Sequence, residues 1–238
     1  MVSRSPSQQF HRMEAIYQGY YSAVNQRKMI CIGRNYHAHI AELNNTTPGS
    51  PLWFDKPMST LLLPEETLNL QRDIHPDIHH EVEVGIVIGM QGRNIKPENA
   101  FKHVAGYFVG LDFTNRILQG VNKKSGADWV LAKGTNQFAA VSEYVHKSAV
   151  VDPSNIDVKL TINGETRQSS NTKMMIFDMQ TMIADISKYQ ELREGDIIFT
   201  GTPEGVGAVK DGDNLVCTIR NGGDEIDLAT LNIKVAYQ

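Results

Sequence analysis

HHEVEVGIVIG, residues 79–89, is the stretch that decides the fold of this chain. Charged and apolar residues alternate over its first half. Its second half is apolar on both faces, as in a strand that is buried from both sides. Because side chains two residues apart project from the same face of a strand, Glu81 and Glu83 share one face. The stretch therefore predicts a strand that carries two carboxylates into the interior.

A second apolar strand ends in a third carboxylate. VAGYFVGLD at 104–112 is apolar up to its last residue, Asp112. An unpaired charge in a protein interior is costly, so three buried carboxylates require a cation. A site built only from carboxylate oxygens suits Mg²⁺, Mn²⁺ or Ca²⁺, and not zinc or copper. The alternative is a half-exposed strand whose glutamates lie in water, and the spacing alone leaves both interpretations open.

Strands outnumber helices in the rest of the chain. Asn163-Gly164 between two alternating runs is typical of a hairpin, and apolar residues at about one-turn spacing indicate the helices. Because strands and helices do not alternate regularly, the class is a strand-dominated α+β fold with a rolled or sandwiched sheet. The sequence predicts a hairpin over 157–168, further strands over 28–33, 196–201, 214–220 and 225–235, and helices over 13–24, 35–43, 114–124 and 174–189.

Composition excludes several classes of protein. The net charge is −4 and no basic stripe is present, which excludes nucleic-acid binding as the main function. No apolar run reaches the roughly 20 residues that a membrane span needs. Cys31 and Cys217 lack metal-type spacing, which excludes a disulfide framework and a zinc ribbon. Such cysteine usage is typical of a reducing compartment, and we expect a soluble protein.

The N-terminal residues stand apart from this pattern. The first 13 residues, MVSRSPSQQFHRM, hold two arginines, three serines and no acid. This composition resembles a weak transit peptide, and a disordered tail is an equal alternative. We therefore expect an N-terminal extension over 1–27, a single domain over 28–238, and a mitochondrial or cytoplasmic location.

Several motifs occur in an order that resembles the fumarylacetoacetate hydrolase family. They are CIGRNYHAHIAEL at 31–43, HHEVEVG at 79–85, LD at 111–112, WVLAKG at 129–134 and GDIIFTGTPEGVG at 195–207. The similarity is greatest to the short members of the family, the acylpyruvases that also act on oxaloacetate. It covers about residues 28–235. The resemblance implies a mixed β-sandwich roll of the family's C-terminal-domain type, one Mg²⁺ or Mn²⁺ per subunit with Ca²⁺ as an alternative, and a homodimer.

The resemblance also implies roles for individual residues. The metal ligands of the family fall on Glu81, Glu83 and Asp112, the three carboxylates already identified. A water-activating dyad falls on His39 and Glu42. These two residues are three apart on the predicted helix and so share a face. There the carboxylate can hold the imidazole in the tautomer that accepts a proton.

The remaining site residues come from the resemblance alone. Lys133 matches the active-site lysine, whose charge can hold a substrate carboxylate or stabilise an oxyanion. Arg34 and Lys56 match positive positions at the mouth of the site. Further substrate-binding residues fall on Arg116, Gln119 and Thr202. Thr202 lies in the TGTP turn at 200–203, whose N–H groups and hydroxyls can bind a carboxylate.

The implied function is a divalent-metal-dependent hydrolase or lyase that acts on small 2-oxo acids. Acylpyruvates such as acetylpyruvate and fumarylpyruvate would be cleaved to pyruvate and an acid, or oxaloacetate would be decarboxylated or tautomerised. One alternative is an isomerase or decarboxylase of a longer dienoic diacid from aromatic breakdown. Another is a metal-binding relative with weakened catalysis. Asn115 and Ile117 replace the small residue and the acid that the family usually has after Asp112, and this departure bears on substrate choice.

Overall fold

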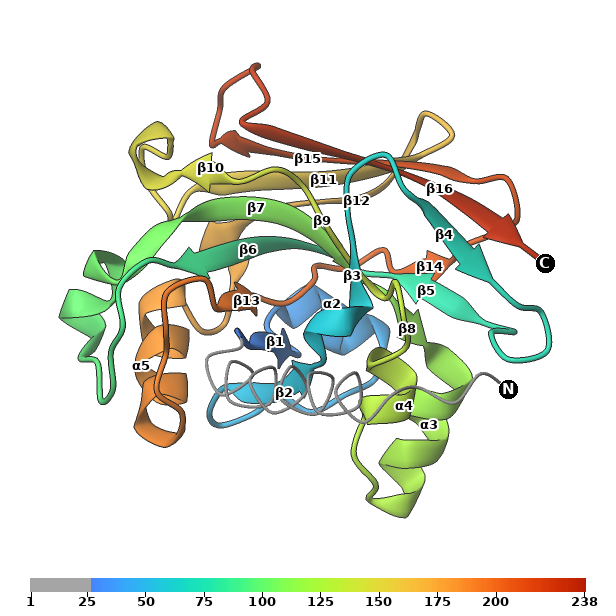
Figure 1. The fold of residues 1–238 in the computed structure, drawn as a ribbon, viewed down its shortest axis with the longest axis horizontal. Helices are drawn as coiled ribbons and strands as arrows, with labels where there is room; N and C mark the ends of the chain where they lie inside the picture. The colour runs from blue at the N-terminus through green and yellow to red at the C-terminus, as the bar shows by residue number, and fades with distance from the viewer. Residues whose placement is uncertain (1–26) are drawn as a thin grey trace, which may run out of the picture.

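The computed structural model describes residues 27–238 and consists mainly of curled, mixed sheets (Figure 1). The helix predicted over 13–24 and nearly all of the expected extension over 1–27 lie outside the described residues. The predicted strand-dominated α+β class is confirmed. None of the helices within 27–238 is long and apolar enough to cross a membrane.

Two large sheets and one small sheet make up the strand framework. Most neighbours are antiparallel, but β1–β13, β3–β9 and β4–β16 are parallel. The eight-stranded sheet has the order β2 (Leu52–Lys56), β1 (Met29–Gly33), β13 (Ile197–Phe199), β6 (Val82–Ile88), β7 (Val104–Asp112), β9 (Ala139–Val141), β3 (Leu61–Leu62), with β10 (Val145–His146) also paired to β7. The five-stranded sheet has the order β12 (Glu165–Asn171), β11 (Ile156–Ile162), β15 (Asn214–Asn221), β16 (Ala229–Tyr237), β4 (Thr67–Leu70), and the small sheet has β14 (Gly207–Ala208), β5 (Ile78–His80), β8 (Thr114–Asn115).

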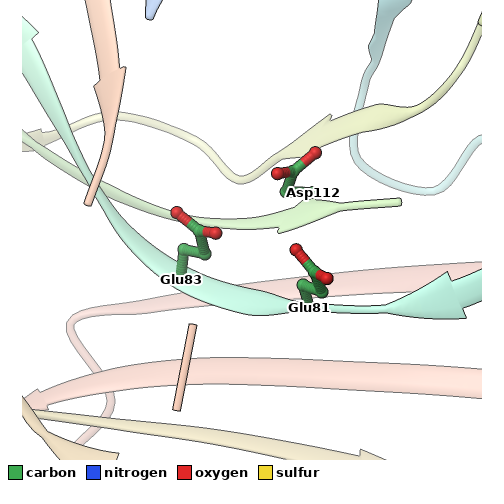
Figure 2. Close-up of side chains that lie close together, drawn as sticks. All are labelled: Glu81, Glu83 and Asp112. Carbon is green, nitrogen blue, oxygen red and sulfur yellow. The ribbon is translucent and has the colours of Figure 1, made fainter. Parts of the chain in front are cut away.

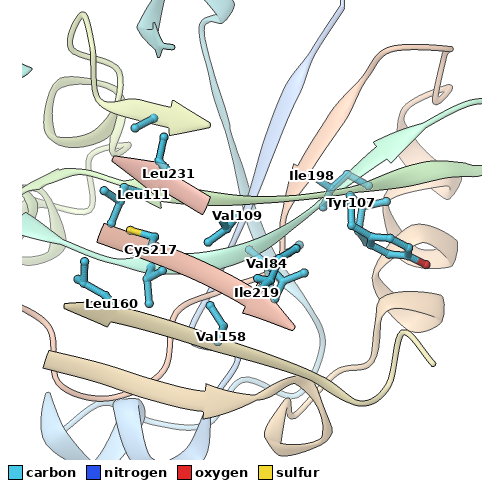
Figure 3. Packing of buried hydrophobic residues seen from close by; sticks show 14 of the residues in the cluster. Val84, Tyr107, Val109, Leu111, Val158, Leu160, Ile198, Cys217, Ile219 and Leu231 are labelled. Carbon is cyan, nitrogen blue, oxygen red and sulfur yellow. The ribbon is translucent and has the colours of Figure 1, made fainter. Parts of the chain in front are cut away.

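The main core lies between the two large sheets. Figure 3 shows Val84 and Leu111 of the eight-stranded sheet facing Leu160 and Ile219 of the five-stranded sheet. All four side chains are fully buried. Burying one such side chain contributes about 1.5–3 kcal/mol, so the two sheets hold each other in place. The opposite face of β6 and β7 is thereby left to carry the polar residues of the site.

The strand predicted over 79–89 is interrupted at Glu81. β5 ends at His80 and belongs to the three-stranded sheet, whereas β6 begins at Val82 and belongs to the eight-stranded sheet. Glu81 lies at the junction, where its carbonyl accepts a hydrogen bond of 2.9 Å from the Asp112 N–H. The prediction of one continuous strand was therefore wrong, because the chain changes pairing partners at this residue.

The helices follow local signals. The helix expected over 35–43 is α2 (His37–Glu42). The one expected over 114–124 is α3 (Arg116–Ser125), which ends at Gly126 with a φ of 72°. α5 (Met179–Tyr189) begins later than the predicted residue 174, because the side chain of Asp178 caps it by accepting from the Thr181 N–H. The short α4 (Val130–Lys133) and the 3₁₀ turns Met58–Thr60, Pro97–Lys102, Lys147–Ala149 and Thr172–Met174 were not predicted.

Candidate metal and substrate site

Strand register brings the three carboxylates together. β6 and β7 pair antiparallel with Glu83 opposite Gly110, so the same register places Glu81 opposite Asp112. Alternation then sets Glu83 and Asp112 on the same face of the sheet. Gly110 has no side chain, and the Phe199 ring and the Ala140 carbonyl fill the position that a Cβ would take there. Figure 2 shows the three carboxylates turned toward one another.

The cluster has the composition of a site for a hard divalent cation. One carboxylate oxygen from each of Glu81, Glu83 and Asp112 lies within 4.8 Å of the others. The three residues are 5%, 1% and 1% exposed. Oxygen-only donors on a rigid sheet are the ligands that Mg²⁺ and Mn²⁺ take in proteins. The residues present therefore fit the predicted ion.

Two lysines and an arginine contact the carboxylates. The Lys133 ammonium donates to Glu81 Oε2 and Asp112 Oδ2, both at 2.6 Å. Arg116 donates to Glu81 Oε1 at 2.8 Å, and Lys56 donates to Asp112 Oδ1 at 2.6 Å. Burial acts to raise the pKa of Glu81, but Lys133 and Arg116 outweigh it, and the pKa of Glu81 is lowered. Burial acts to lower the pKa of Lys133, but the carboxylates of Asp112 and Glu81 outweigh it, and the pKa of Lys133 is raised.

The location expected for Lys56 was wrong. It was placed at the mouth of the site, but its side chain is buried and does not line the cavity. Besides Asp112, it donates to the Phe138 carbonyl at 2.6 Å. Lys56 therefore pairs with Asp112 on the side that faces away from the cavity. A buried carboxylate needs such an ionic partner.

Glu83 is held by the TGTP turn. The Gly201 N–H donates to Glu83 Oε2 at 2.6 Å. Burial, followed by the charges of Asp112 and Glu81, raises the pKa of Glu83 well above its usual value. The turn is tied to β6, because the hydroxyls of Thr200 and Thr202 donate to the carbonyls of Val84 and Val82. The carboxylate at this turn is thus the side chain of Glu83, whereas a substrate carboxylate was expected.

His39 and Glu42 face each other on α2. Nδ1 of His39 lies 3.5 Å from Glu42 Oε2, at the outer limit of a hydrogen bond, and has no closer partner among the described residues. Glu42 also accepts from the Gly205 N–H at 3.1 and 3.2 Å. Burial lowers the pKa of His39 below 6.5. The imidazole is therefore neutral at pH 7, and a hydrogen on Nδ1, on the side of Glu42, would leave Nε2 as the proton acceptor.

A cavity of about 40 Å³ connects these groups. The predicted residues Arg34, His39, Arg116, Gln119, Lys133 and Thr202 line it together with the three carboxylates. Arg34 has a φ of 58°, a conformation that costs energy outside glycine and that occurs at functional sites. Gln119 accepts from Arg116 at 2.6 Å. Sequence reasoning missed seven further lining residues: Ile32, Gly33, Leu43, Asn45, Phe54, Lys123 and Trp129.

Buried amides support the site from outside the cavity. The Asn35 side chain donates to the carbonyls of Phe177 and Thr200 and accepts from the Phe177 N–H. Gln168 accepts from the Val82 N–H and donates to the Thr202 hydroxyl. Neither amide was predicted, because its partners lie more than 30 positions away in the sequence.

Three comparisons place this geometry among known proteins. Residues 28–236 match the family described as fumarylacetoacetate (FAA) hydrolase C-terminal. The protein named oxaloacetate tautomerase FAHD1, mitochondrial, of Arabidopsis thaliana is 43% identical over 192 residues, which is 81% of this chain and 86% of that protein. The oxaloacetate decarboxylase, mitochondrial, of Dictyostelium discoideum is 41% identical over 81% of this chain and 88% of its own length. The crystal structure of fumarylpyruvate hydrolase from Pseudomonas aeruginosa in complex with Mn²⁺ and pyruvate superposes with a TM-score of 0.80, at 34% identity, over 89% of this chain and 90% of that one.

Proposed function

The chain belongs to the fumarylacetoacetate hydrolase family, and from this premise we propose that it is a divalent-metal-dependent enzyme that acts on oxaloacetate. The observation that carries the proposal is the group of three buried carboxylates, Glu81, Glu83 and Asp112, at the floor of a cavity lined by cations. Relatives named for oxaloacetate chemistry, at more than 40% identity over four fifths of the chain, support this substrate.

The carboxylates would hold one Mg²⁺ or Mn²⁺ ion. When bound, the ion supplies a Lewis acid that polarises the carboxylate and keto oxygens of a 2-oxo acid. Two cationic side chains lie beside the carboxylates that would hold the ion. Lys133 and Arg116 each contact Glu81, so they reinforce the positive potential where negative charge develops on the substrate oxygen.

His39 is the residue that moves a proton. Because its imidazole is neutral and Nδ1 faces Glu42, Nε2 can take a proton from carbon 3 of oxaloacetate. The C–H electron pair then forms the C2–C3 double bond of the enol, and the keto oxygen receives the proton that the protonated His39 returns. Decarboxylation breaks the C3–C4 bond to the distal carboxylate instead, releases carbon dioxide, leaves the enolate of pyruvate and needs no base at carbon 3. We place tautomerisation first, because it uses His39 directly.

Acylpyruvate hydrolysis is the second candidate function. The structure of fumarylpyruvate hydrolase with Mn²⁺ and pyruvate superposes on this chain, and the His39–Glu42 pair suits the deprotonation of water. Water would add to the distal carbonyl, the C–C bond would break, and pyruvate enolate would leave.

A chelator experiment with two variants tests the proposal. Loss of enol oxaloacetate, followed by its ultraviolet absorbance, is expected to require Mg²⁺ or Mn²⁺ and to stop on addition of EDTA. Glu83→Gln is expected to lower both turnover and ion affinity more than a hundredfold, because it removes one of three charged ligands. The exposed Glu98 is the matched control, and Glu98→Gln is expected to change neither.

Two results would contradict the proposal. Full activity in EDTA, or in Glu83→Gln, would remove the metal assignment. Tight binding of Mn²⁺ without turnover of oxaloacetate or acetylpyruvate would indicate a metal-binding relative without catalysis.

We also propose a mitochondrial location, with the cytoplasm as the alternative, because both named relatives are described as mitochondrial. A fluorescent protein fused after residue 238 is expected to colocalise with mitochondria. The same fusion without residues 1–27 is expected to stay in the cytoplasm.

A further inference from the structure

α3 presents a row of polar side chains to the cavity. Arg116, Gln119 and Lys123 follow one another at i, i+3 and i+7, which places them on one helix face, and all three line the cavity. Ile117 and Val121 occupy the opposite face and are 51% and 55% exposed. Arg116 contacts Glu81, so the row begins at the carboxylates. Lys123 lies two turns farther along, about 10 Å along the helix axis.

Positive charge is unbalanced at this outer end. The inner cations Lys56, Lys133 and Arg116 all pair with Glu81 or Asp112. Within residues 27–238, neither Arg34 nor Lys123 forms such an ion pair. Burial lowers the pKa of Lys123, and repulsion from Arg34 and Arg116 lowers it further. An anionic group between these side chains would relieve the repulsion.

Asn45 holds Lys123 across the mouth of the cavity. Asn45 follows α2 and also lines the cavity, and its side-chain oxygen accepts from the Lys123 ammonium at 2.5 Å. An ammonium has three N–H donors, so two remain for a ligand. Because long side chains on a helix lean toward its N-terminus, the charge of Lys123 is directed back toward Gln119.

The spacing along α3 sets the length of the ligand. Lys123 lies seven residues from Arg116, about 10 Å along the helix axis, and its side chain leans back toward Gln119. A ligand that spans from the carboxylates to Lys123 is therefore short. It must also carry a negative charge at its far end.

We propose that Lys123, positioned by Asn45, binds the second carboxylate of a short dicarboxylic 2-oxo acid and thereby selects such acids over 2-oxo acids with an uncharged tail. The inference rests on the proposed function, in which the 2-oxo acid end of the substrate lies at Glu81, Glu83 and Asp112. Lys123 is thus a specificity-determining residue at the outer end of α3.

Lys123→Gln tests the proposal through the comparison of two substrates. The variant keeps a polar chain of similar size and removes the charge. Its KM for oxaloacetate is expected to rise about fivefold, the effect of losing a partly exposed ion pair. Its KM for acetylpyruvate, whose tail is uncharged, and its kcat are expected to stay within about twofold of wild type. Lys124→Gln is the matched control, because Lys124 is exposed on the same helix and does not line the cavity.

A binding measurement separates this inference from the proposed function. Malate and lactate differ only in the second carboxylate, and their dissociation constants with the Mg²⁺-loaded protein can be measured by calorimetry. Lys123→Gln and Asn45→Ala are both expected to weaken the binding of malate several-fold and to leave the dissociation constant of lactate unchanged. An unchanged malate-to-lactate ratio in Lys123→Gln, or the same loss in Lys124→Gln, overturns the inference. Absence of turnover in the wild-type protein overturns the proposed function alone.

Discussion

Lys133 lies between two of the carboxylates that we propose bind a metal ion. Its ammonium contacts Glu81 and Asp112 at 2.6 Å each, and its Nζ lies 5.3 Å from the centre of the Phe54 ring. Each carboxylate oxygen has two lone pairs, so contact with Lys133 leaves acceptor sites for a second cation. At the scale of single residues, the site therefore depends on pairing. The buried carboxylates and the buried ammonium of Lys133 neutralise one another, and either charge would be unstable there without the other.

His39 distinguishes reactions that need a base from one that does not. His39→Ala is expected to lower acetylpyruvate hydrolysis and oxaloacetate tautomerisation at least a hundredfold. Oxaloacetate decarboxylation is expected to fall less than about tenfold, because loss of carbon dioxide needs no proton acceptor. Absorbance assays of each substrate measure this. His37→Ala is the control, because His37 is exposed on the same helix, and equal losses in all three reactions would contradict the role of His39.

The pH dependence of the base-catalysed reactions follows from the burial of His39. Because burial lowers the pKa of His39 below 6.5, the imidazole stays neutral at pH 7, and activity is lost only as the pH falls through that lowered value. The unfolded chain binds the proton more readily, so stability also declines as the pH falls below 6.5. Rate profiles from pH 4.5 to 8 check the first effect. An acid limb above pH 6.5 would contradict it.

At the scale of elements, the TGTP turn depends on a glycine. Gly201 has a φ of +99°, and a Cβ there would lie 2.7 Å from Asn35 Cβ. Gly201→Ala is expected to lower the free energy of unfolding by about 2–3 kcal/mol, from backbone strain and overpacking together. Ion affinity is also expected to fall, because the Gly201 N–H holds Glu83.

Gly212 is the matched control for this substitution. It has a φ of +81°, and a Cβ added there would meet no atom within 4 Å. Gly212→Ala therefore isolates the backbone strain, about 1 kcal/mol. Urea unfolding and calorimetric Mn²⁺ titration measure both quantities. Equal stability losses in the two variants would show that the contact with Asn35 is unimportant.

Elements with local signals were predictable from the sequence. β7 spans 104–112 as expected, because its residues are apolar on both faces, and the hairpin turns at Asn163-Gly164 with both φ values positive. The junction at Glu81 was not predictable, because it depends on which strands pair with β5 and with β6. The burial of Lys56 and the lining role of Trp129 likewise depend on contacts between distant segments. Lys123 had a usable signal, since it continues the spacing of Arg116 and Gln119.

At the scale of the whole molecule, the expected homodimer stays a prediction. α3 and the neighbouring α4 expose Ile117, Val121, Val130 and Leu131, each more than half accessible. Exposed apolar side chains that form one contiguous patch mark an association surface, and α3 and α4 pack against each other. Sedimentation equilibrium is expected to give twice the chain mass of 26.6 kDa. A mass of one chain at micromolar concentration would contradict the dimer.

One loop contacts both the carboxylate cluster and the His39–Glu42 pair. The Gly201 N–H holds the carboxylate of Glu83, and four residues later the Gly205 N–H holds that of Glu42. The length of the loop thus fixes the distance between the carboxylates that we propose bind the metal ion and the His39–Glu42 pair. Its length is consequently a stricter requirement than the identity of the exposed Glu204 within it. Inserting one residue into this loop would move the His39–Glu42 pair away from the three carboxylates, although each group would itself stay intact.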